Sequence, residues 1–145
     1  MDIEIRKLGP GDEAVLERVA PGVFDEPVRP DLVRAFLAEP RYRIFVALDG
    51  GLVIGMATGF THFHPDKPED FFVNELGVDD GYLRRGIGTR LMRAILAEAR
   101  AMGCADAWLG TELSNGPALA LYRKLMEAGD AEETMSVFTY DLAGR

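Results

Sequence analysis

Residues 71–103, FFVNELGVDDGYLRRGIGTRLMRAILAEARAMG, restrict the fold of this chain more than any other stretch. Residues 71–78 are apolar at most positions, which predicts a strand in the interior of a sheet. From Ile87 onward the apolar residues recur at helical spacing, and this pattern closes at Gly103. A helix that follows a strand in this way usually crosses over to a parallel strand. The stretch therefore predicts that residues 71–78 and 105–111 are parallel neighbours.

The remaining elements alternate along the chain. DIEIRKL predicts a strand, and YRIFVALDGG and LVIGMATGFTHF predict two strands joined at the turn DGG. Helical spacing recurs in PGDEAVLERVA, DLVRAFLAEP and GPALALYRKLMEAG, whereas PGVFDEPVRP must be a loop. ADAWLGTE and ETMSVFTYDL predict the last strands. We expect an α/β (α+β) fold in one domain over 1–145, with about six to seven strands in a mixed sheet and about four helices.

Composition limits the function classes. The 145 residues carry a net charge of −8, which argues against a nucleic-acid partner. The acidic charge suits a cationic substrate, although it also fits a protein that is acidic only for solubility. Cys104 is the single cysteine, so neither an internal disulfide nor a thiolate zinc cluster is expected. No apolar run is long enough to span a membrane and no signal peptide is evident, so we expect a cytoplasmic protein without a membrane partner.

The segment RRGIG at the start of the predicted long helix has the features of an anion site. Free N–H groups at a helix N-terminus favour a negative charge, and glycines let a phosphate approach the backbone. Arg84 and Arg85 add positive charge. The Gly-Lys-Ser/Thr of a Walker loop is absent, and the third glycine of a dinucleotide fingerprint is replaced by Leu91. The alternative is a helix start softened by glycine, with solvated arginines.

Two longer segments add a family resemblance. VNELGVDDGYLRRGIGTRLMRAILAEARAMG followed by ELSNGPALALYRKL resembles the GNAT superfamily of N-acetyltransferases, which transfer an acetyl group from acetyl-CoA to an amine. The first family signature, Arg/Gln-x-x-Gly-x-Gly/Ala, falls on Gly86 and Gly88, with Leu83 at the Arg/Gln position. The second comprises Asn115, Ala118, Leu121, Tyr122, Lys124 and Leu125. The resemblance covers about residues 70–127 and implies a GNAT-like fold.

Within the superfamily, the chain is most similar to the type I aminoglycoside 3-N-acetyltransferases. The shared features are Glu75 in the central strand, Glu112 at the end of the next strand, and PALALYRKL. This similarity implies a small cationic amine as substrate, with aminoglycosides as the leading class. Dimers are common among relatives, so the resemblance also allows a homodimer.

The chemistry of acetyl transfer assigns roles to these residues. Glu75 is the candidate general base that removes a proton from the amine, and Tyr122 is the candidate acid that protonates the CoA thiolate. Their alternatives are a structural carboxylate and a core tyrosine. Glu112 is the candidate that grips the cationic substrate together with Glu75. The candidate residues for acetyl-CoA are Leu76, Gly77, Val78, Arg84, Arg85, Gly86, Ile87, Gly88, Thr89, Asn115 and Ala118; Asn115 fits a helix cap equally well.

Other polar residues receive less specific expectations. His62 and His64 flank Phe63, but two histidines without a nearby third ligand make a weak metal site, so no metal is expected. Asp79 and Asp80 fit a turn. Trp108 and Cys104 fit packing positions. Four acidic residues in predicted loops could rim a pocket or be merely solvated: Glu26, Asp66, Glu69 and Asp70.

Three functions remain open from the sequence. The favoured one is an acetyl-CoA-dependent N-acetyltransferase that acts on a small polyamine-like substrate by direct transfer in a ternary complex. The second keeps this chemistry but uses a peptide N-terminus or a lysine as the acceptor. The third is an acyl-CoA-binding module without turnover.

Overall fold

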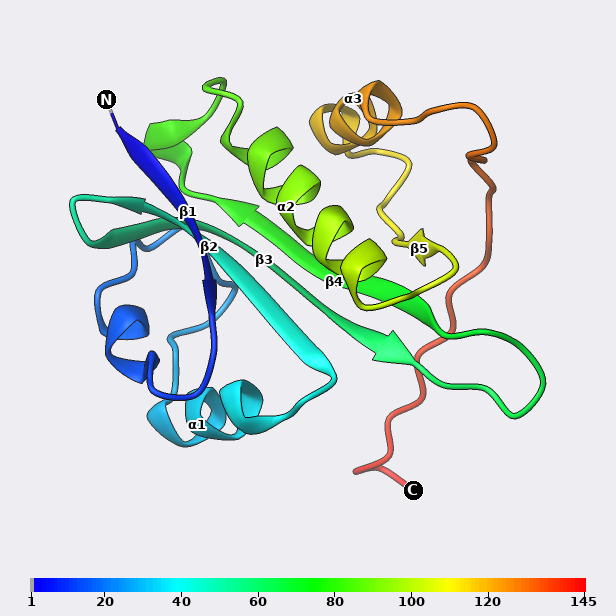
Figure 1. The fold of residues 1–145 in the computed structure, drawn as a ribbon, viewed down its shortest axis with the longest axis horizontal. Coiled ribbons are helices and arrows are strands. Elements are labelled where there is room, and N and C mark those ends of the chain that lie inside the picture. The colour runs from blue at the N-terminus through cyan, green and yellow to red at the C-terminus, as the bar shows by residue number, and fades with distance from the viewer. Residues whose placement is uncertain (1) are drawn as a thin grey trace. The chain divides into compact units, whose positions relative to one another are not determined.

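The computed structural model describes residues 2–145, which form two compact units, one ending at Glu112 and the other running from Leu113 to Arg145. The first unit holds a five-stranded sheet in the order β1-β2-β3-β4-β5 (Figure 1). Its strands are β1 (Ile3–Leu8), β2 (Tyr42–Asp49), β3 (Leu52–His62), β4 (Asp70–Val78) and β5 (Ala107–Trp108). Its helices are η1 (Glu13–Glu17), α1 (Pro30–Ala38), η2 (Asp80–Tyr82) and α2 (Ile87–Ala101). The second unit contains α3 (Gly116–Lys124).

The sheet is mixed, as expected. β1 to β4 pair antiparallel with their neighbours, whereas β4 and β5 pair in parallel after the crossover through α2. The turn between β2 and β3 consists of Gly50 and Gly51, whose φ angles are 55° and 86°. Two positive φ angles define the type I′ turn that matches the twist of a hairpin, and glycine adopts them without strain. The predicted hairpin and the predicted parallel pair are both confirmed.

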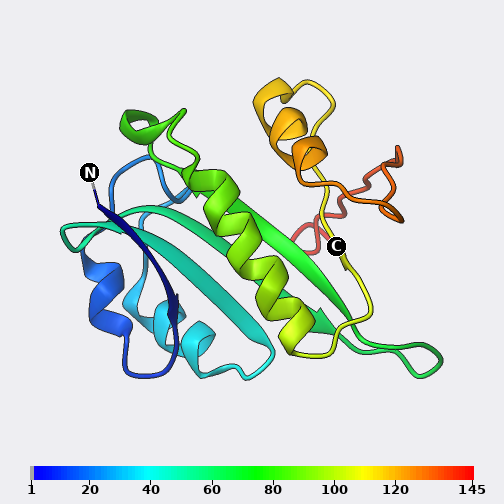
Figure 2. The same cartoon turned by 45° about the horizontal axis from the view of Figure 1, so that its top comes forward.

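The two faces of the sheet are covered by different elements. A side chain at Gly55 on β3 would meet Leu91 and Ile87 of α2, so this face packs against α2. The next residue, Met56, points to the opposite face, because side chains alternate along a strand. Its Cε lies near the Cβ position of Gly77, which is covered by the backbone of Val23. In Figure 2, α2 runs across one face of the sheet, while η1 and α1 lie on the other.

The core lies between the sheet and these helices. Its fully buried large side chains come from the central strand β3, from β2 and β4 on either side of it, and from the inner face of α2: Val46, Val53, Ile54, Phe71, Leu91 and Ile95. α2 therefore buries the apolar stripe that its sequence predicted, and it fixes its first turn beside the C-terminal end of β4.

Several predicted elements are shorter than expected or absent. There are five strands and three α-helices in the described residues, against the six to seven strands and four helices predicted. The helix expected after residue 10 is the 3₁₀-helix η1, because spacing of apolar residues by three suits both helix types. β5 has two residues, and Trp108, expected in the core, is 43% exposed.

The predicted last strand, 133–142, is not formed in the described structure. Its large apolar side chains are exposed on both alternating faces, with Val137 at 82% and Phe138 at 76%. Alternating apolar residues indicate that a segment suits a sheet, but a strand also needs a paired neighbour. The single domain over 1–145 stays a prediction. No helix within residues 2–145 has both the length and the apolar character required to cross a membrane.

Candidate functional site

β4 has an open edge over its C-terminal half. β5 pairs only with Phe71 and Phe72, so residues 73–78 have no strand neighbour on that side in the described chain. On the other side Glu75, Leu76, Gly77 and Val78 pair with β3. In an antiparallel pair, every second residue directs its N–H and C=O away from its partner. This edge can therefore bind an extended group with amide functions, as an added strand would be bound.

The chain continues from this edge into the start of α2. Arg84 and Gly86 both adopt left-handed backbone conformations, with φ of 64° and 74°. Gly86 is the N-cap of α2, and no side chain in the described chain caps the helix there. The first turn holds no acidic residue, so the helix dipole and its N–H groups are available to an anion. Arg84 and Arg85 are exposed beside it, and Arg85 lies over the ring of Tyr82 at 5.1 Å.

Glu75 lies on β4 just before the open edge reaches α2. It pairs with Thr58 across β3, so both side chains lie on the sheet face that is turned away from α2. Glu75 is exposed as a residue, yet partial burial of its carboxyl, together with the negative charge of Asp25, raises its pKa above the ordinary value of 4.5. Thr58 Oγ1 is buried and has no hydrogen-bond partner among the described residues.

The loop that carries Asp25 forms one wall of a groove in the first unit. This groove has a volume of about 760 Å³ and lies between η1, residues 19–28 and α1. The loop is proline-rich, as predicted, and contains neither helix nor strand between residues 21 and 29. Four carboxylates and one guanidinium belong to the lining: Glu13, Glu17, Asp25, Glu26 and Arg34. The groove is therefore acidic and suits a cationic ligand.

Gly77 fixes the loop against β4. A Cβ atom at this position would overlap the carbonyl oxygen of Val23, so only glycine allows the two backbones to approach this closely. Asp79, which directly follows β4, accepts hydrogen bonds from Gly22 N at 3.0 Å and from Gly81 N at 3.1 Å. These contacts attach the wall of the groove to the strand that bears Glu75.

The second unit contains the other predicted residues on α3. The Asn115 side chain accepts a hydrogen bond from Ala118 N at 3.2 Å and caps the helix, which is one of its two predicted roles. Tyr122 is partly buried, and this burial raises the pKa of its phenol above 10.0. The phenol is therefore protonated at neutral pH and can donate a proton.

The remaining predicted acidic residues separate into different places. Glu26 lines the groove, whereas Glu112 follows β5 and is not among the lining residues. Asp79 is a turn residue, as expected. Asp66 and Glu69 lie in the β3–β4 connection, and Asp70 begins β4 at the end opposite Glu75.

Sequence reasoning missed Asp25, Glu13 and Glu17 as members of the acidic groove. Asp25 and Glu75 are separated by fifty positions, and only the tertiary contact of the loop with β4 brings them together. The sequence did contain one signal for this groove. PGVFDEPVRP holds two adjacent acidic residues in a segment that cannot form a helix or strand, and binding residues often lie in such loops.

Comparisons with known proteins agree with this architecture. The N-alpha-acetyltransferase RimI of Mycobacterium tuberculosis is 36% identical over 103 residues, which are 71% of this chain and 63% of that protein. The L-2,4-diaminobutyric acid acetyltransferase of Marinococcus halophilus is 31% identical over 98 residues, which are 67% of this chain and 56% of that protein. The chain thus spans less than two thirds of the length of these curated relatives.

Solved structures show the same fold. An aminoglycoside acetyltransferase, meta-AAC0020, from an uncultured soil metagenomic sample, in complex with sisomicin, superposes with a TM-score of 0.79 at 23% identity, over 97% of this chain and 96% of that one. Aminoglycoside N-acetyltransferase AAC(6')-Iy in complex with CoA gives a TM-score of 0.70 at 18% identity, over 97% and 95%. The model of the acetyltransferase (GNAT) family matches residues 14–127, most of the sequence. The chain belongs to the acetyltransferase (GNAT) family.

Proposed function

We propose that this protein is an acetyl-CoA-dependent N-acetyltransferase that acetylates a small cationic amine, with aminoglycosides as the leading acceptor class and the 3-amino group as the position. One observation carries the proposal. Glu75 feels the negative charge of Asp25, a residue of the acidic groove, and lies on the strand whose open edge leads to the start of α2. This supports Glu75 as a proton acceptor between an acidic groove and a surface suited to an extended, phosphate-bearing molecule.

The residues of the first unit fit acetyl-CoA. Its pyrophosphate requires N–H donors and positive charge, which Arg84, Arg85 and residues 86–89 offer at the uncapped helix start. Its pantetheine arm carries amide groups, which the backbone of Leu76, Gly77 and Val78 can bind along the open edge. An arm bound in this direction carries the thioester back toward Glu75.

The reaction we propose is a direct transfer in a ternary complex. Glu75 accepts a proton from the substrate ammonium, either directly or through one water, and the neutral amine then attacks the thioester carbonyl carbon. The new C–N bond forms, the C–S bond breaks, and CoA leaves as a thiolate. N–H groups near Leu76 stabilise the developing oxyanion. Tyr122, whose phenol stays protonated at neutral pH, is the proposed donor of a proton to the thiolate.

The acceptor class rests on the charge of the groove. Four carboxylates against one guanidinium favour an acceptor with several amino groups. The named activity of the Marinococcus relative on a small diamino acid supports a small amine. We retain Glu112 as a further candidate for holding the acceptor. An aminoglycoside acceptor makes the protein an antibiotic-resistance enzyme.

A second function is supported by the relationship to RimI, which is named as an N-alpha-acetyltransferase and is the more similar of the two relatives described. In this alternative the acceptor is the N-terminus of a peptide or protein. The groove would then hold the first residues of an extended chain, and Glu75 would keep its role.

The experiment compares acceptors with mass as the readout. Purified protein and acetyl-CoA are incubated separately with gentamicin-type aminoglycosides, 2,4-diaminobutyrate and an alanine-initiated peptide. We expect one added acetyl group on the aminoglycoside, and NMR of the product locates it. Product on the peptide alone would select the second function, and no product with any amine, despite CoA binding, would reject catalysis.

Glu75→Gln tests the proposed base. The amide cannot accept the proton, so we expect kcat/KM to fall by about 10²–10⁴. Glu133→Gln is the matched control, because this exposed residue lies in the second unit and makes the same chemical change. A Glu75→Gln rate within threefold of wild type would contradict the assignment. Tyr122→Phe tests the acid in the same assay.

A further inference from the structure

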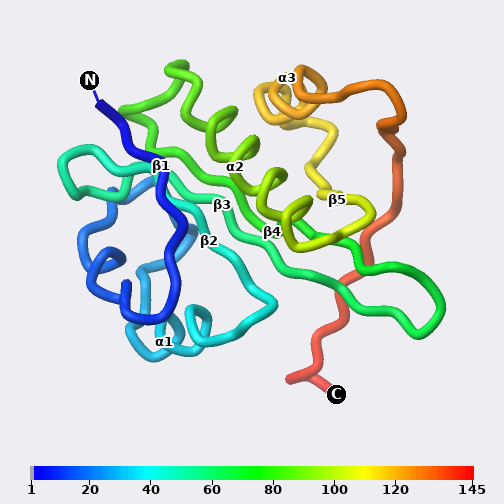
Figure 3. Tube along the Cα trace, viewed as in Figure 1, coloured from blue at the N-terminus to red at the C-terminus, as the bar shows by residue number. Residues whose placement is uncertain are grey.

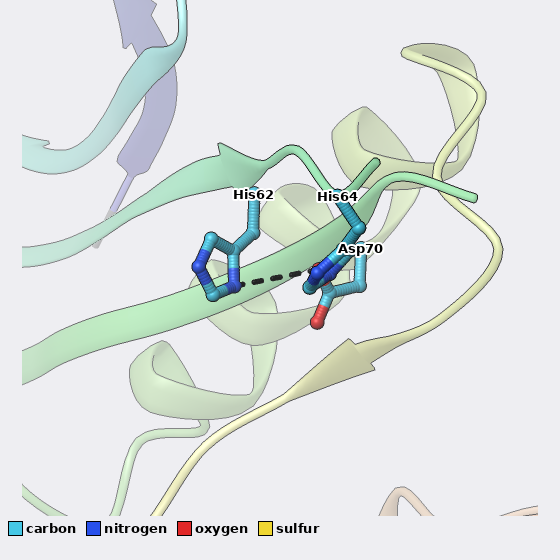
Figure 4. Close-up of side chains that lie close together, drawn as sticks. All are labelled: His62, His64 and Asp70. Atoms are coloured by element: carbon cyan, nitrogen blue, oxygen red, sulfur yellow. Dashed lines mark hydrogen bonds and ion pairs between the residues drawn. The ribbon is translucent and has the colours of Figure 1, made fainter. Parts of the chain in front are cut away.

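The end of β4 opposite Glu75 carries a second cluster of functional side chains: His62, His64 and Asp70 (Figure 4). His64 Nε2 lies 2.9 Å from Asp70 Oδ1, and His62 Nδ1 lies 3.6 Å from the same oxygen. One donor atom from each residue lies within 4.8 Å of the other two. Within residues 2–145, no other three histidine, cysteine or acidic residues bring donor atoms this close.

The fold brings these three residues together. His62 and Asp70 are register partners at the last pair of β3 and β4, so their side chains share one face. The connection 63–69 projects beyond the sheet and starts with Phe63 and His64 (Figure 3). The His62 and His64 ring centroids lie 4.8 Å apart. The sequence predicted no metal because a third ligand was lacking, and Asp70 now occupies that position.

Asp70 is held in an orientation that suits a ligand. Trp108 Nε1 donates a hydrogen bond to Asp70 Oδ2 at 3.0 Å, and so the other oxygen, Oδ1, faces the imidazoles. The Asp70 side chain is only 18% exposed. Hydrogen bonds from outside a metal site commonly orient its ligands in this way. Trp108 is thus a positioning residue for Asp70.

We propose that His62, His64 and Asp70 form a binding site for a divalent transition-metal cation, with Zn²⁺ as the reference ion. Two imidazole nitrogens and one carboxylate oxygen are ligands that zinc and its neighbours accept. Tetrahedral zinc with bonds of about 2.0–2.1 Å requires ligand atoms about 3.3 Å apart. The distances to Asp70 Oδ1 are 2.9 and 3.6 Å, and the three ligand atoms lie within 4.8 Å of one another, so binding requires a shift of the half-exposed His62. Because the His62 side chain is half-exposed, its ring can move toward the ion, and a water can bind as the fourth ligand.

This site is separate from the proposed acetyl-transfer site. Asp70 and Glu75 are five residues apart on β4, or about 16 Å along the strand. A bound cation would join the end of β3, the 63–69 connection and the start of β4, and through Trp108 also β5. Its effect is therefore on stability. At a free Zn²⁺ concentration a hundred times the Kd, we expect the Tm to rise by roughly 5–10 °C.

The test titrates the full chain, prepared without a histidine tag, with Zn²⁺ and monitors heat, with Co²⁺ visible absorption as a second probe of coordination. His62 and His64 are the only two histidines, so a change in imidazole NMR signals reports on this cluster alone. We expect one Zn²⁺ per chain. His64→Gln should weaken binding at least tenfold, and Trp108→Phe, which removes the hydrogen bond to Asp70, should weaken it roughly tenfold while leaving the stoichiometry at one.

The controls separate this cluster from other metal-binding groups. Asp66→Asn removes an exposed carboxylate from the same connection, and Cys104→Ser removes the single thiol; both should keep the wild-type affinity. If His64→Gln does not fold, His62→Gln decides, because His62 is half-exposed and its replacement is tolerated. The proposal is overturned if wild type binds no Zn²⁺, if both histidine variants bind as tightly as wild type, or if binding is lost in Cys104→Ser. Acetyl transfer, where detected, should be unchanged by chelation.

Discussion

The carboxyl of Glu75, the proposed general base, has a raised pKa. Its pKa is raised first by partial burial and second by Asp25, and this second cause cannot be read from the sequence around Glu75. The sequence placed Glu75 in an apolar strand and predicted burial there. The structure shows that β4 is most buried at Phe71 and Val73, exposed at Asn74 and Glu75, and half-buried from Leu76 to Val78. The sequence proposed Glu75 from the chemistry of acetyl transfer, whereas the influence of Asp25 depends on the packing of a distant loop.

Asp25→Asn tests this environment. Because a general base must be deprotonated, the rate should fall as the pH decreases through the raised pKa of Glu75. Replacement of Asp25 removes a negative charge, lowers the pKa of Glu75 and should shift the acidic limb of the kcat/KM profile to lower pH. Asp66→Asn serves as the control and should leave the limb in place. A shift to higher pH would contradict the proposed interaction.

Thr58 offers a prediction about stability. Its hydroxyl is buried without a partner among the described residues, and such a group costs about 1–3 kcal/mol. Thr58→Val keeps the shape and removes the hydroxyl, so the free energy of unfolding in urea should rise by roughly 1 kcal/mol. Thr61 is a second buried threonine of β3, but its hydroxyl is not among the buried groups that lack a hydrogen-bond partner. Thr61→Val should therefore give no such gain. Equal effects at the two positions would argue against the assignment.

At the level of elements, one carboxylate joins β1, β2 and α2. Glu98 on α2 accepts hydrogen bonds from Arg43 Nε at 2.8 Å and from Lys7 Nζ at 3.2 Å. Burial by itself would raise the pKa of Glu98, but these two hydrogen bonds outweigh it and hold the pKa below 4.5. The amphipathic pattern predicted which face of α2 is buried, yet it could not identify this contact, because its partners lie 91 and 55 residues away.

Glu98→Gln should therefore lower the free energy of unfolding by about 1–3 kcal/mol at pH 7. A carboxyl with a lowered native pKa stabilises the fold above its unfolded pKa, and this contribution disappears as the pH falls through the native pKa. The difference between wild type and variant should consequently shrink below about pH 4. Urea unfolding of both proteins at a series of pH values measures this difference in the free energy of unfolding. A difference that is constant with pH would mean that the charge of Glu98 is not involved.

For the whole molecule, the sequence predicted the features that have a local pattern better than those that depend on strand pairing or loop packing. The Gly50–Gly51 hairpin and the α2 crossover have strong local signals, and both were predicted. The number of strands was overestimated, because 133–142 shows strand-like alternation without the neighbour that a strand requires, and the strand predicted over 105–112 is limited to its two residues paired with β4. The groove is lined only by residues 13–34 and the histidine cluster spans residues 62–70. Neither was predicted, because both depend on how an irregular connection folds, and that folding leaves no periodic pattern in the sequence.

Amide hydrogen exchange can test this description of the whole chain. Backbone amides of residues 133–142 take part in no helix or strand in the described structure, whereas Val53, Ile54 and Ala57 on β3 are fully buried. We expect exchange of the first group to be at least about a hundredfold faster than that of the second. Cys104, with its single thiol, provides no disulfide that could slow opening. Protection of 133–142 equal to that of β3 would restore the strand that its alternation predicted.

The open edge of β4 has a consequence for the protein in solution. A row of unpaired N–H and C=O groups is a template for another strand, and proteins generally shield such edges to prevent self-association. Here the proposed use of the edge is to receive a substrate, so it cannot be shielded permanently. A well-supplied enzyme would keep this surface covered, and a starved one would expose it to other copies of itself. The supply of acetyl-CoA would then govern resistance to aggregation as well as turnover.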